Sequence, residues 1–422
     1  MFSVIFSMKL LRNSLLVVIG LLVLIAVGAP RVIGPQIETV WMEQLGRIKE
    51  VERTDYQRGW FGAEAHTQIS ASDGPTELRS EIQHGPLLFT AVGPRVGAVY
   101  SVTTLVPEQL PAALRAQLEA LYGRLEDSPL RLETVVGMDN NIENTLRLES
   151  FTRSDASGEL QFEGAEVRFL TDYTGAVLNG TVQVGEIRHS EGGHEKFYSA
   201  PANGEMVIVP GRSLEGSLQW PLLKAETESG PLELRQVQLD LALTVIGGGR
   251  LKLESKFDAP QVQSATPVSA VSQRVNVPEI APAVLSHYLS QLIPVSGARQ
   301  WPEVFQPPLV LKQQLLVESA NGPIMLDADI NWRGFSAGAR QVNQAQARWL
   351  APMTGTMTFS AAEQALLQSP LIGQALLLRK YGLLEEEDGE LQMLLEVDRG
   401  ELKVNGQPLP PDLFLMAITG QF

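Results

Sequence analysis

Apolar and polar residues alternate with a period of two along most of the chain after residue 60. In residues 237–245 (VQLDLALTV) the apolar side chains fall on one face of a strand, and Gln238, Asp240 and Thr244 fall on the other. The alternation resumes in residues 251–257 after the turn sequence GGGR, so the two segments are predicted to form a hairpin. The pattern recurs in residues 129–136, 145–151, 158–169, 309–317, 324–332, 391–397 and 401–406.

Few segments have the 3.6-residue period of a helix. Helices are predicted in residues 111–123, 277–293, 360–382 and 409–419, and the third is interrupted at Pro370 because proline removes a hydrogen-bond donor. The two patterns together predict an α+β fold that is mainly β. Its large antiparallel sheet or sheets should have one apolar face and a few covering helices, after an N-terminal transmembrane helix.

The segment 258–273 (DAPQVQSATPVSAVSQ) carries little charge and is the best candidate for a linker. We therefore expect a β-rich part over residues 36–257, a linker or long connection over 258–276, and a mixed α/β part over 277–422.

Residues 13–29 (NSLLVVIGLLVLIAVGA) form an uninterrupted uncharged segment, preceded by Lys9 and Arg12. Its 17 residues are near the lower limit for spanning about 30 Å of hydrocarbon. The positive-inside rule then places the N-terminus in the cytoplasm and the rest of the chain beyond the membrane. A cleaved signal peptide is the alternative, with small residues at 26–28, but the apolar run is longer than the usual signal core. We expect an uncleaved signal anchor over residues 1–35.

The composition excludes several classes of protein. The formal net charge of −15 argues against nucleic-acid binding, because affinity for phosphate comes mainly from Lys and Arg. The chain has no cysteine, which excludes thiolate catalysis, disulfides and Cys-ligated metals. A proportion of 44% hydrophobic residues in 422 is typical of a folded protein that can bury a sizeable core.

No common catalytic or nucleotide-binding motif is present: the P-loop, H-E-x-x-H and G-x-S-x-G patterns are all absent. His189 and His194, with Glu191 and Glu195, resemble zinc ligands, but the glycine pair between the histidines favours a solvated hairpin tip. Asp327 and Asp329 match the first ligand positions of an EF-hand calcium loop, but the later ligands of that loop are missing. The alternation of the sequence explains both residues as part of the solvent-exposed face of a strand. The acidic run 385–388 is interpreted as a solvated turn. We expect no catalytic, cofactor-binding or metal-binding residue and no cofactor.

His84, in EIQHGPLLF, is the best isolated candidate for a catalytic base. Its nearest acidic neighbour, Glu81, is three residues away and would point to the opposite face of a strand, so the two are not expected to form a dyad. Gly85 and Pro86 are typical of a bend or the end of a strand. We therefore interpret His84 as a residue beside a turn.

Several segments in this order resemble a bacterial envelope family of unknown function, the YdgA-like proteins: the N-terminal anchor, residues 56–70 (YQRGWFGAEAHTQIS), the His84-Gly85-Pro86 tripeptide and residues 398–416 (DRGELKVNGQPLPPDLFLM). The resemblance implies an inner-membrane anchor and a periplasmic body in a Gram-negative bacterium, and it implies no activity. The residues that mark it without an assigned role are Tyr56, Arg58, Gly59, Phe61, His84, Gly85 and Pro86.

We expect Tyr56, Trp60 and Phe61 to anchor the first strand in the core rather than to grip a ligand. The expected function is that of a non-enzymatic, membrane-anchored periplasmic protein that binds an apolar ligand, such as a lipid, or an envelope partner. Two alternatives stay open: an envelope hydrolase that uses a carboxylate pair, and an assembly scaffold in which a sheet edge pairs with a partner strand.

Overall fold

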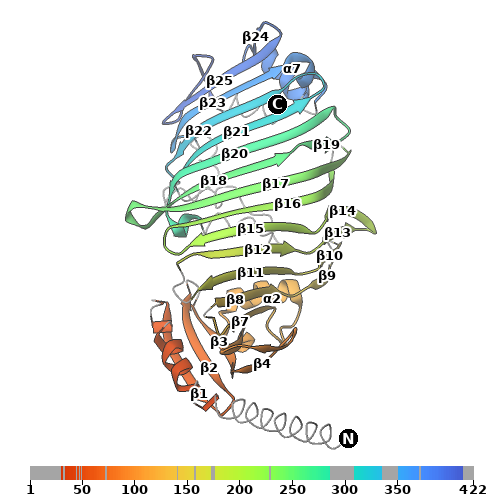
Figure 1. The fold of residues 1–422 in the computed structure, drawn as a ribbon. Coiled ribbons are helices and arrows are strands. Elements are labelled where there is room, and N and C mark those ends of the chain that lie inside the picture. The colour runs from red at the N-terminus through yellow and green to blue at the C-terminus, as the bar shows by residue number, and fades with distance from the viewer. Residues whose placement is uncertain are drawn as a thin grey trace, which may run out of the picture. The chain divides into compact units, whose positions relative to one another are not determined.

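β-Strands make up most of the chain in the computed structural model (Figure 1). The structure describes residues 30–31, 34–43, 45–46, 48, 50–71, 74–139, 141–155, 158–172, 176–227, 230–285, 308–334, 350–369 and 372–411. The chain divides into two compact units. Unit 1 comprises Met1–Ser154 and Gln161–Val184, and unit 2 comprises Asp155–Leu160 and Gly185–Phe422.

Unit 1 is built on an antiparallel sheet in which the strand order is β1-β2-β3-β6-β7-β8-β11-β12. Its strands are β1 (Val51–Arg58), β2 (Gly62–Ala71), β3 (Gly74–His84), β6 (Val99–Leu105), β7 (Leu130–Val136), β8 (Asn141–Leu148), β11 (Ala165–Asp172) and β12 (Leu178–Val184). A separate hairpin of β4 (Leu87–Thr90) and β5 (Gly93–Val96) leaves the sheet between β3 and β6. The strands β9 (Phe151–Asp155) and β10 (Gly158–Phe162) cross the boundary between the units.

Residues 34–43 form a helix that packs on this sheet. Its Ile37 and Trp41 contact a core cluster that includes Ala65, Ile82 and Val99. A short 3-10 turn η1 (Pro107–Gln109) precedes the helix α2 (Ala112–Tyr122), which begins after Pro111 and ends at Gly123. The predicted helix over 111–123 is thus confirmed.

Unit 2 is a succession of antiparallel strands, most of them joined by tight turns. Its strands are β13 (Ile187–Glu191), β14 (His194–Ser199), β15 (Ala202–Val209), β16 (Ser213–Thr227), β17 (Gly230–Ile246), β18 (Arg250–Ala259), β19 (Gln261–Gln263), β20 (Val268–Ile280), β21 (Leu309–Ser319), β22 (Ile324–Trp332), β23 (Met353–Ala362), β24 (Glu385–Glu387), β25 (Glu390–Asp398), β26 (Glu401–Val404) and β27 (Gln407–Leu409). The predicted hairpin is confirmed, because β17 and β18 pair around the turn η2 (Gly247–Gly249).

Helices and the segment that follows β20 pack on parts of the apolar face of this sheet. Leu366 of α6 (Glu363–Leu367) and Leu378 of α7 (Ile372–Lys380) belong to one buried cluster with Leu391 and Leu395 of β25. Farther along the sheet, Leu285 packs with residues of β17, β18, β20 and β21. Burial of alternate side chains beneath these segments explains the period-two pattern of the sequence.

The structure differs from the sequence-based expectations at three places. The expected connection over 258–276 instead contains β19, which pairs with β17, and β20, which pairs with β18 and β21. The helix predicted from residue 277 begins only after β20 ends at Ile280. Within the acidic run, residues 385–387 form the exposed strand β24 rather than a turn.

Three other expectations fall partly or wholly outside the described residues: the anchor at 13–29, the second half of the helix at 277–293, and the C-terminal helix from residue 412 onward. None of the helices in the described part of the chain combines the length and the apolar character needed to cross a bilayer.

Candidate functional site

A groove of about 840 Å³ crosses unit 2 and is lined by residues of β15–β18 and β20–β23. Strand pairing sets the middle of its lining in one row: Leu241 lies opposite Gly216 and Ser255, and Val275 lies opposite Ser255 and Gln313. The groove therefore runs across the strands rather than along them. Eight neighbouring strands about 4.8 Å apart give it a length of about 34 Å.

The lining combines residues from both alternations of the strands, and its charged residues share one face of the sheet. At β23 its lining includes Thr356 and Thr358 but not Met357 between them. Met357 packs against the buried cluster beneath the helices, so its side chain points to the other face. Asp327 and Asp329 pair with Thr358 and Thr356 and share their face, because successive side chains of a strand point to opposite sides.

Charged side chains of both signs line the groove: Glu205, Glu215, Asp240, Glu254, Asp327, Asp329, Lys256, Arg274 and Lys312. Lys312 Nζ lies 2.7 Å from Asp329 Oδ2. Within the described residues, Glu205, Glu215 and Asp327 take part in no ion pair. The groove thus has an excess of carboxylates, several of which can accept a cationic ligand group.

A second cavity, of about 350 Å³, has the opposite chemistry. Its lining comes from β16–β21 and the adjoining turns, and includes Leu234, Phe257, Val262, Val271 and Val317. Its volume falls within the range of about 300–1,000 Å³ that is usual for small-molecule sites.

His84 ends β3, directly before Gly85, and is only 3% exposed. Its Nε2 lies 3.4 Å from the hydroxyl of Tyr56, and its Nδ1 has no hydrogen-bond partner among the described residues. A Cβ placed on Gly34 would lie 3.0 Å from that Nδ1, so helix 34–43 packs directly on the imidazole. No described carboxylate is within hydrogen-bond reach of the ring, and the arrangement is that of a buried packing residue rather than a general base.

Burial dominates the electrostatics of this corner. It lowers the pKa of His84, and the Arg58 guanidinium lowers it further. Burial also raises the pKa of Tyr56 to about 12, with a further contribution from Glu38. Both groups are therefore held neutral near pH 7.

The tripeptide after β3 brings two backbone segments into close contact. A Cβ on Gly85 would lie 1.8 Å from the carbonyl oxygen of Gly97, so only glycine fits there. The Gly85–Pro86 peptide bond is cis, and the Gly85 N–H donates to the carbonyl of Ala98 at 2.8 Å. These residues shape the chain where the β4–β5 hairpin leaves the sheet.

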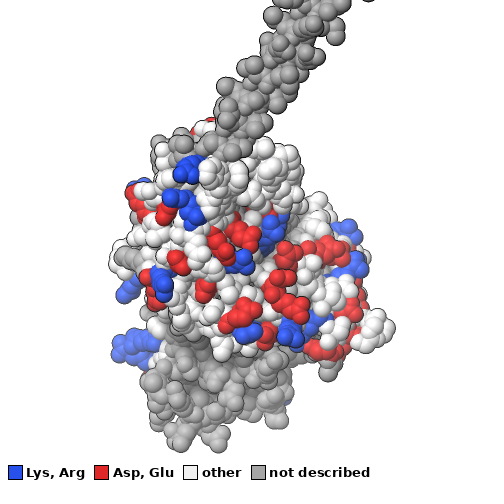
Figure 2. Space-filling view, turned by 90° about the horizontal axis from the view of Figure 1, so that it is seen from below, with Lys and Arg blue, Asp and Glu red and all other residues white. Residues whose placement is uncertain are grey.

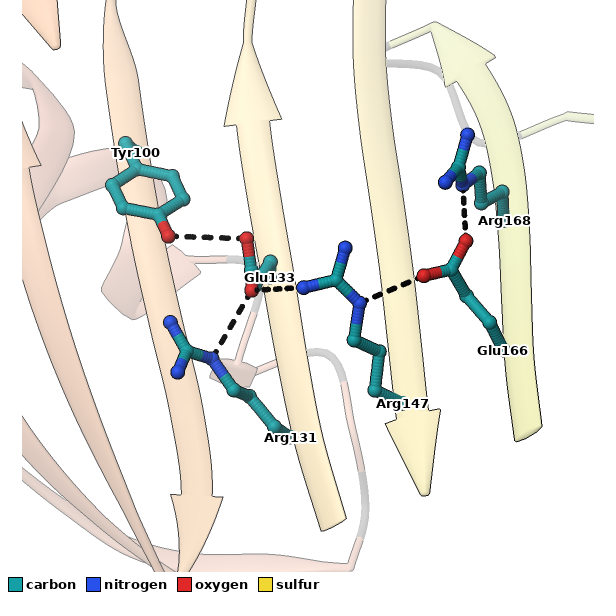
Figure 3. Close-up of polar contacts among 6 residues, drawn as sticks. All are labelled: Tyr100, Arg131, Glu133, Arg147, Glu166 and Arg168. Carbon is teal, nitrogen blue, oxygen red and sulfur yellow. Dashed lines mark hydrogen bonds and ion pairs between the residues drawn. The ribbon is translucent and has the colours of Figure 1, made fainter. Parts of the chain in front are cut away.

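Glu133 is the centre of an ion-pair network in unit 1 (Figure 3). Its carboxylate accepts hydrogen bonds from the Tyr100 hydroxyl at 3.1 Å and from Arg147 Nη1 at 3.0 Å. Arg131 Nε lies 3.1 Å from the same carboxylate. Glu133 is 8% exposed, so its charge is neutralised by neighbours rather than by water.

The network continues through Arg147, whose Nε donates to Glu166 at 2.7 Å, and Arg168 pairs with Glu166 on its other side. Burial tends to raise the pKa of Glu166, but the hydrogen bonds from the two guanidinium groups outweigh it, and the pKa is lowered. A hydrogen bond from Arg188 likewise lowers the pKa of Glu186. A hydrolase acid needs a raised pKa, so neither carboxylate supports the hydrolase alternative.

The sequence-predicted sites take ordinary structural positions. His189 and His194 lie in the β13–β14 hairpin, whose turn is Gly192-Gly193, as predicted. Among the residues that the structure describes, no group of three or more His, Asp or Glu side chains is arranged to hold a metal ion. Asp327 and Asp329 are exposed on β22, and they also line the groove.

Of the residues that mark the family resemblance, Tyr56 packs against the core cluster of unit 1. Arg58 forms an ion pair with Glu38 at 2.7 Å. Gly59 donates its N–H to the carbonyl of Gly62 in the β1–β2 turn. The expectation that Trp60 and Phe61 anchor the first strand in the core is wrong.

Trp60 is 48% exposed and Phe61 is 57% exposed, and both residues lie in the turn between β1 and β2. Their ring centroids lie 6.5 Å apart.

The sheet edges that the structure describes are poor templates for strand addition. Among the described strands β1 pairs only with β2, and its exposed side chains include Glu52, Arg53 and Asp55. At the other end of the chain, β27 has three residues, one of them Pro408. Charges, short length and proline are the usual means of blocking edge pairing, which weighs against the scaffold alternative.

The groove was not predicted from the sequence. The sequence feature that marks it is a pair of polar residues two positions apart, such as Glu254 and Lys256 in β18 or Asp327 and Asp329 in β22, which recurs from strand to strand. On the face that Figure 2 draws, acidic and basic groups are also interspersed rather than gathered by sign. Only the strand register brings the repeats into two rows.

Comparison with curated proteins and with solved structures finds no match for this chain. Residues 8–249, more than half of the chain, match the model of a family described as bacterial protein of unknown function (DUF945). The chain belongs to this bacterial family of unknown function.

Proposed function

We propose that the protein is a membrane-tethered periplasmic binding protein whose groove in unit 2 holds an extended, net-cationic polypeptide segment. The observation that carries this proposal is the groove itself, which crosses eight strands and includes nine charged residues in its lining. The structure offers no comparably built catalytic centre among the described residues, so binding rather than catalysis is the function that the geometry supports best.

The dimensions suit a linear ligand. An extended polypeptide advances about 3.3 Å per residue, so a groove of about 34 Å takes about ten residues. Side chains of both signs in the lining can pair with a polypeptide that carries both charges, and the excess of carboxylates favours one that is net positive. The same carboxylates disfavour nucleic acid and acyl chains in this groove.

The tether is proposed from the sequence. The apolar run 13–29, preceded by Lys9 and Arg12, has the length and flanking charge of a signal anchor. Together with the family resemblance it supports an inner-membrane location with the two units in the periplasm.

Photo-crosslinking in cells tests the groove. A benzophenone-bearing phenylalanine analogue is placed at Ser217 or Thr358, both in the lining, and at Thr244 as a control. Thr244 is exposed on β17, two residues beyond the lining residue Ala242 on the same face. We expect a crosslinked polypeptide from the two groove positions only. Crosslinks of equal yield at all three positions, or at none, would contradict the proposal.

Charge reversal adds a second control. The double variant E205K/E215K should remove the crosslink from Ser217, because it converts two unpaired carboxylates of the lining into cations. The double variant E387K/E390K changes the same net charge at an exposed site in β24 and β25 and should leave the crosslink unchanged.

The apolar cavity supports a second candidate function, the binding of a lipid acyl chain. Leu234, Phe257 and Val271 supply the apolar walls that such a ligand needs. Native mass spectrometry of the detergent-extracted full chain tests this candidate: a co-purifying lipid should be present in the wild type and lost in V271W, which fills the cavity. Retention of lipid in V271W, or its absence from the wild type, would exclude this cavity as the site.

A further inference from the structure

Exposed large apolar side chains gather at one end of the sheet of unit 1. They come from the β1–β2 turn, the β4–β5 hairpin and the β7–β8 turn, and we call them the apolar rim: Trp60, Phe61, Leu87, Phe89, Val92, Val96 and Met138. Their exposed fractions range from 45% for Leu87 to 73% for Val92 and Val96. An apolar group of this kind on a folded protein usually marks a contact surface.

Hydrogen bonds between the strand ends show that the three turns are neighbours. The His84 N–H donates to Phe61 O, and the Ala98 N–H donates to Val136 O, each at 2.8 Å. Strand pairing sets His84 opposite Val99 and Val99 opposite Val136. The β1–β2 turn, the stem of the hairpin and the β7–β8 turn therefore lie next to one another at this end of the sheet.

The hairpin is held firmly enough to present its side chains. Leu88 is fully buried, whereas its neighbours Leu87 and Phe89 are exposed. Gln83 fixes the strand by hydrogen bonds with both the N–H and the carbonyl of Phe89, at 2.9 and 3.2 Å. The alternation thus leaves one face of the hairpin packed and the other outward.

The chain itself indicates what covers the rim. The guanidinium carbon of Arg31 lies 4.7 Å from the centre of the Trp60 ring. Arg31 is only two residues after Ala29, the last residue of the uncharged run 13–29. The described residue that contacts Trp60 thus follows the uncharged run almost directly in the sequence.

We propose that the apolar rim inserts into the surface of the bilayer that residues 13–29 enter, an inference that rests on the proposed tether. Tryptophan is enriched at the boundary between lipid headgroups and acyl chains, and phenylalanine and leucine side chains there insert into the apolar layer while nearby cations contact phosphate. Arg31, stacked on Trp60, is placed to meet a headgroup phosphate. The rim therefore acts as a second membrane contact that fixes the orientation of unit 1 on the lipid surface.

Because the chain has no cysteine, a spin label attached to one introduced cysteine reports on that position alone. Single cysteines replace Phe89 or Val92 in the rim, or Glu108 as a control, and each carries a nitroxide label in the full chain. Glu108 is exposed in η1, just after β6, at the opposite end of that strand from Val99. The labelled chains are incorporated into vesicles of phosphatidylethanolamine and phosphatidylglycerol at 3:1, and relaxation by oxygen and by a water-soluble nickel chelate is compared.

We expect labels at positions 89 and 92 to be relaxed more by oxygen than by the nickel chelate, and the label at 108 to show the reverse. Flotation of the vesicles reports on the tether separately. A chain that floats with all three labels equally accessible to nickel would overturn the rim while keeping the tether. A chain that fails to float would overturn both. The variant V92D/V96D should abolish the oxygen preference of the label at 89 without preventing flotation.

Discussion

The hydroxyl of Tyr56 lies 3.4 Å from Nε2 of His84, in a corner closed by helix 34–43. Both side chains come from segments that mark the family resemblance, and the structure brings them together although 28 residues separate them. The contact joins β1 to β3 across the intervening β2 and lies under the helix. Its neutral, buried character indicates that it stabilises the packing of the helix on unit 1.

This corner predicts a dependence of stability on pH. The folded-state pKa of His84 is lowered, so its contribution to the free energy of unfolding is fully present above about pH 6.5 and is lost as the pH falls through the folded-state pKa. Urea unfolding of wild type and H84Q between pH 5 and 8 measures it. The stability difference between the two proteins should shrink toward acid.

His66 supplies a control of opposite sign. Its hydrogen bond with Glu77 raises its pKa, so its contribution is present below about pH 6.5 and is lost as the pH rises through the folded-state pKa. H66Q should therefore differ most from the wild type at acid pH. Equal pH profiles for H84Q and H66Q would contradict both assignments.

The ion-pair network around Glu133 predicts that exchanging one carboxylate oxygen for an amide nitrogen lowers the free energy of unfolding strongly. E133Q removes the charge but keeps the shape, and leaves the guanidinium groups of Arg131 and Arg147 without their shared anion. We expect a loss of about 2–3 kcal/mol in the free energy of unfolding. The exposed pair Arg95–Glu143 is the control, and E143Q should cost less than about 1 kcal/mol.

The close backbone contact at Gly85 predicts that alanine is not tolerated there. A Cβ 1.8 Å from the Gly97 carbonyl forces the two segments apart, so G85A should lower the free energy of unfolding by at least about 2 kcal/mol. Gly373 is an open position in α7 with nothing within 4 Å of an added Cβ. G373A should instead stabilise the protein by about 0.5–1 kcal/mol, and thermal unfolding of both variants checks the contrast.

The period of the sequence was sufficient to predict the antiparallel strands, the β17–β18 hairpin and α2. It was not sufficient for β19, which has only three residues, or for β20, because a strand with partners on both sides can form without strong alternation. The prediction of a helix from residue 277 was wrong for a different reason. Val277 and Ile280 are buried at the end of β20, but their spacing of three residues also fits one face of a helix.

The groove could not have been predicted, since it depends on register. Asp327 and Asp329 were recognised as the wet face of a strand, which is correct locally. The same face lines a groove only because seven neighbouring strands contribute the rest of the lining. The sequence of β22 does not indicate which residues of those strands lie opposite its own residues.

The β1–β2 turn was misread for a different reason, because hydrophobicity alone does not distinguish a core residue from an exposed one. Trp60 is 48% exposed and buries only about half of its surface, so W60A should lower the free energy of unfolding by about 1–2 kcal/mol, less than the loss of a fully buried aromatic side chain. I82A, at a site that is 3% exposed in the same unit, should cost about 2–5 kcal/mol. Urea unfolding in detergent measures both variants. A loss at Trp60 as large as that at Ile82 would return this residue to the core and remove the physical basis of the apolar rim. A smaller loss than at Ile82 would agree with the 48% exposure of Trp60, on which the apolar rim rests.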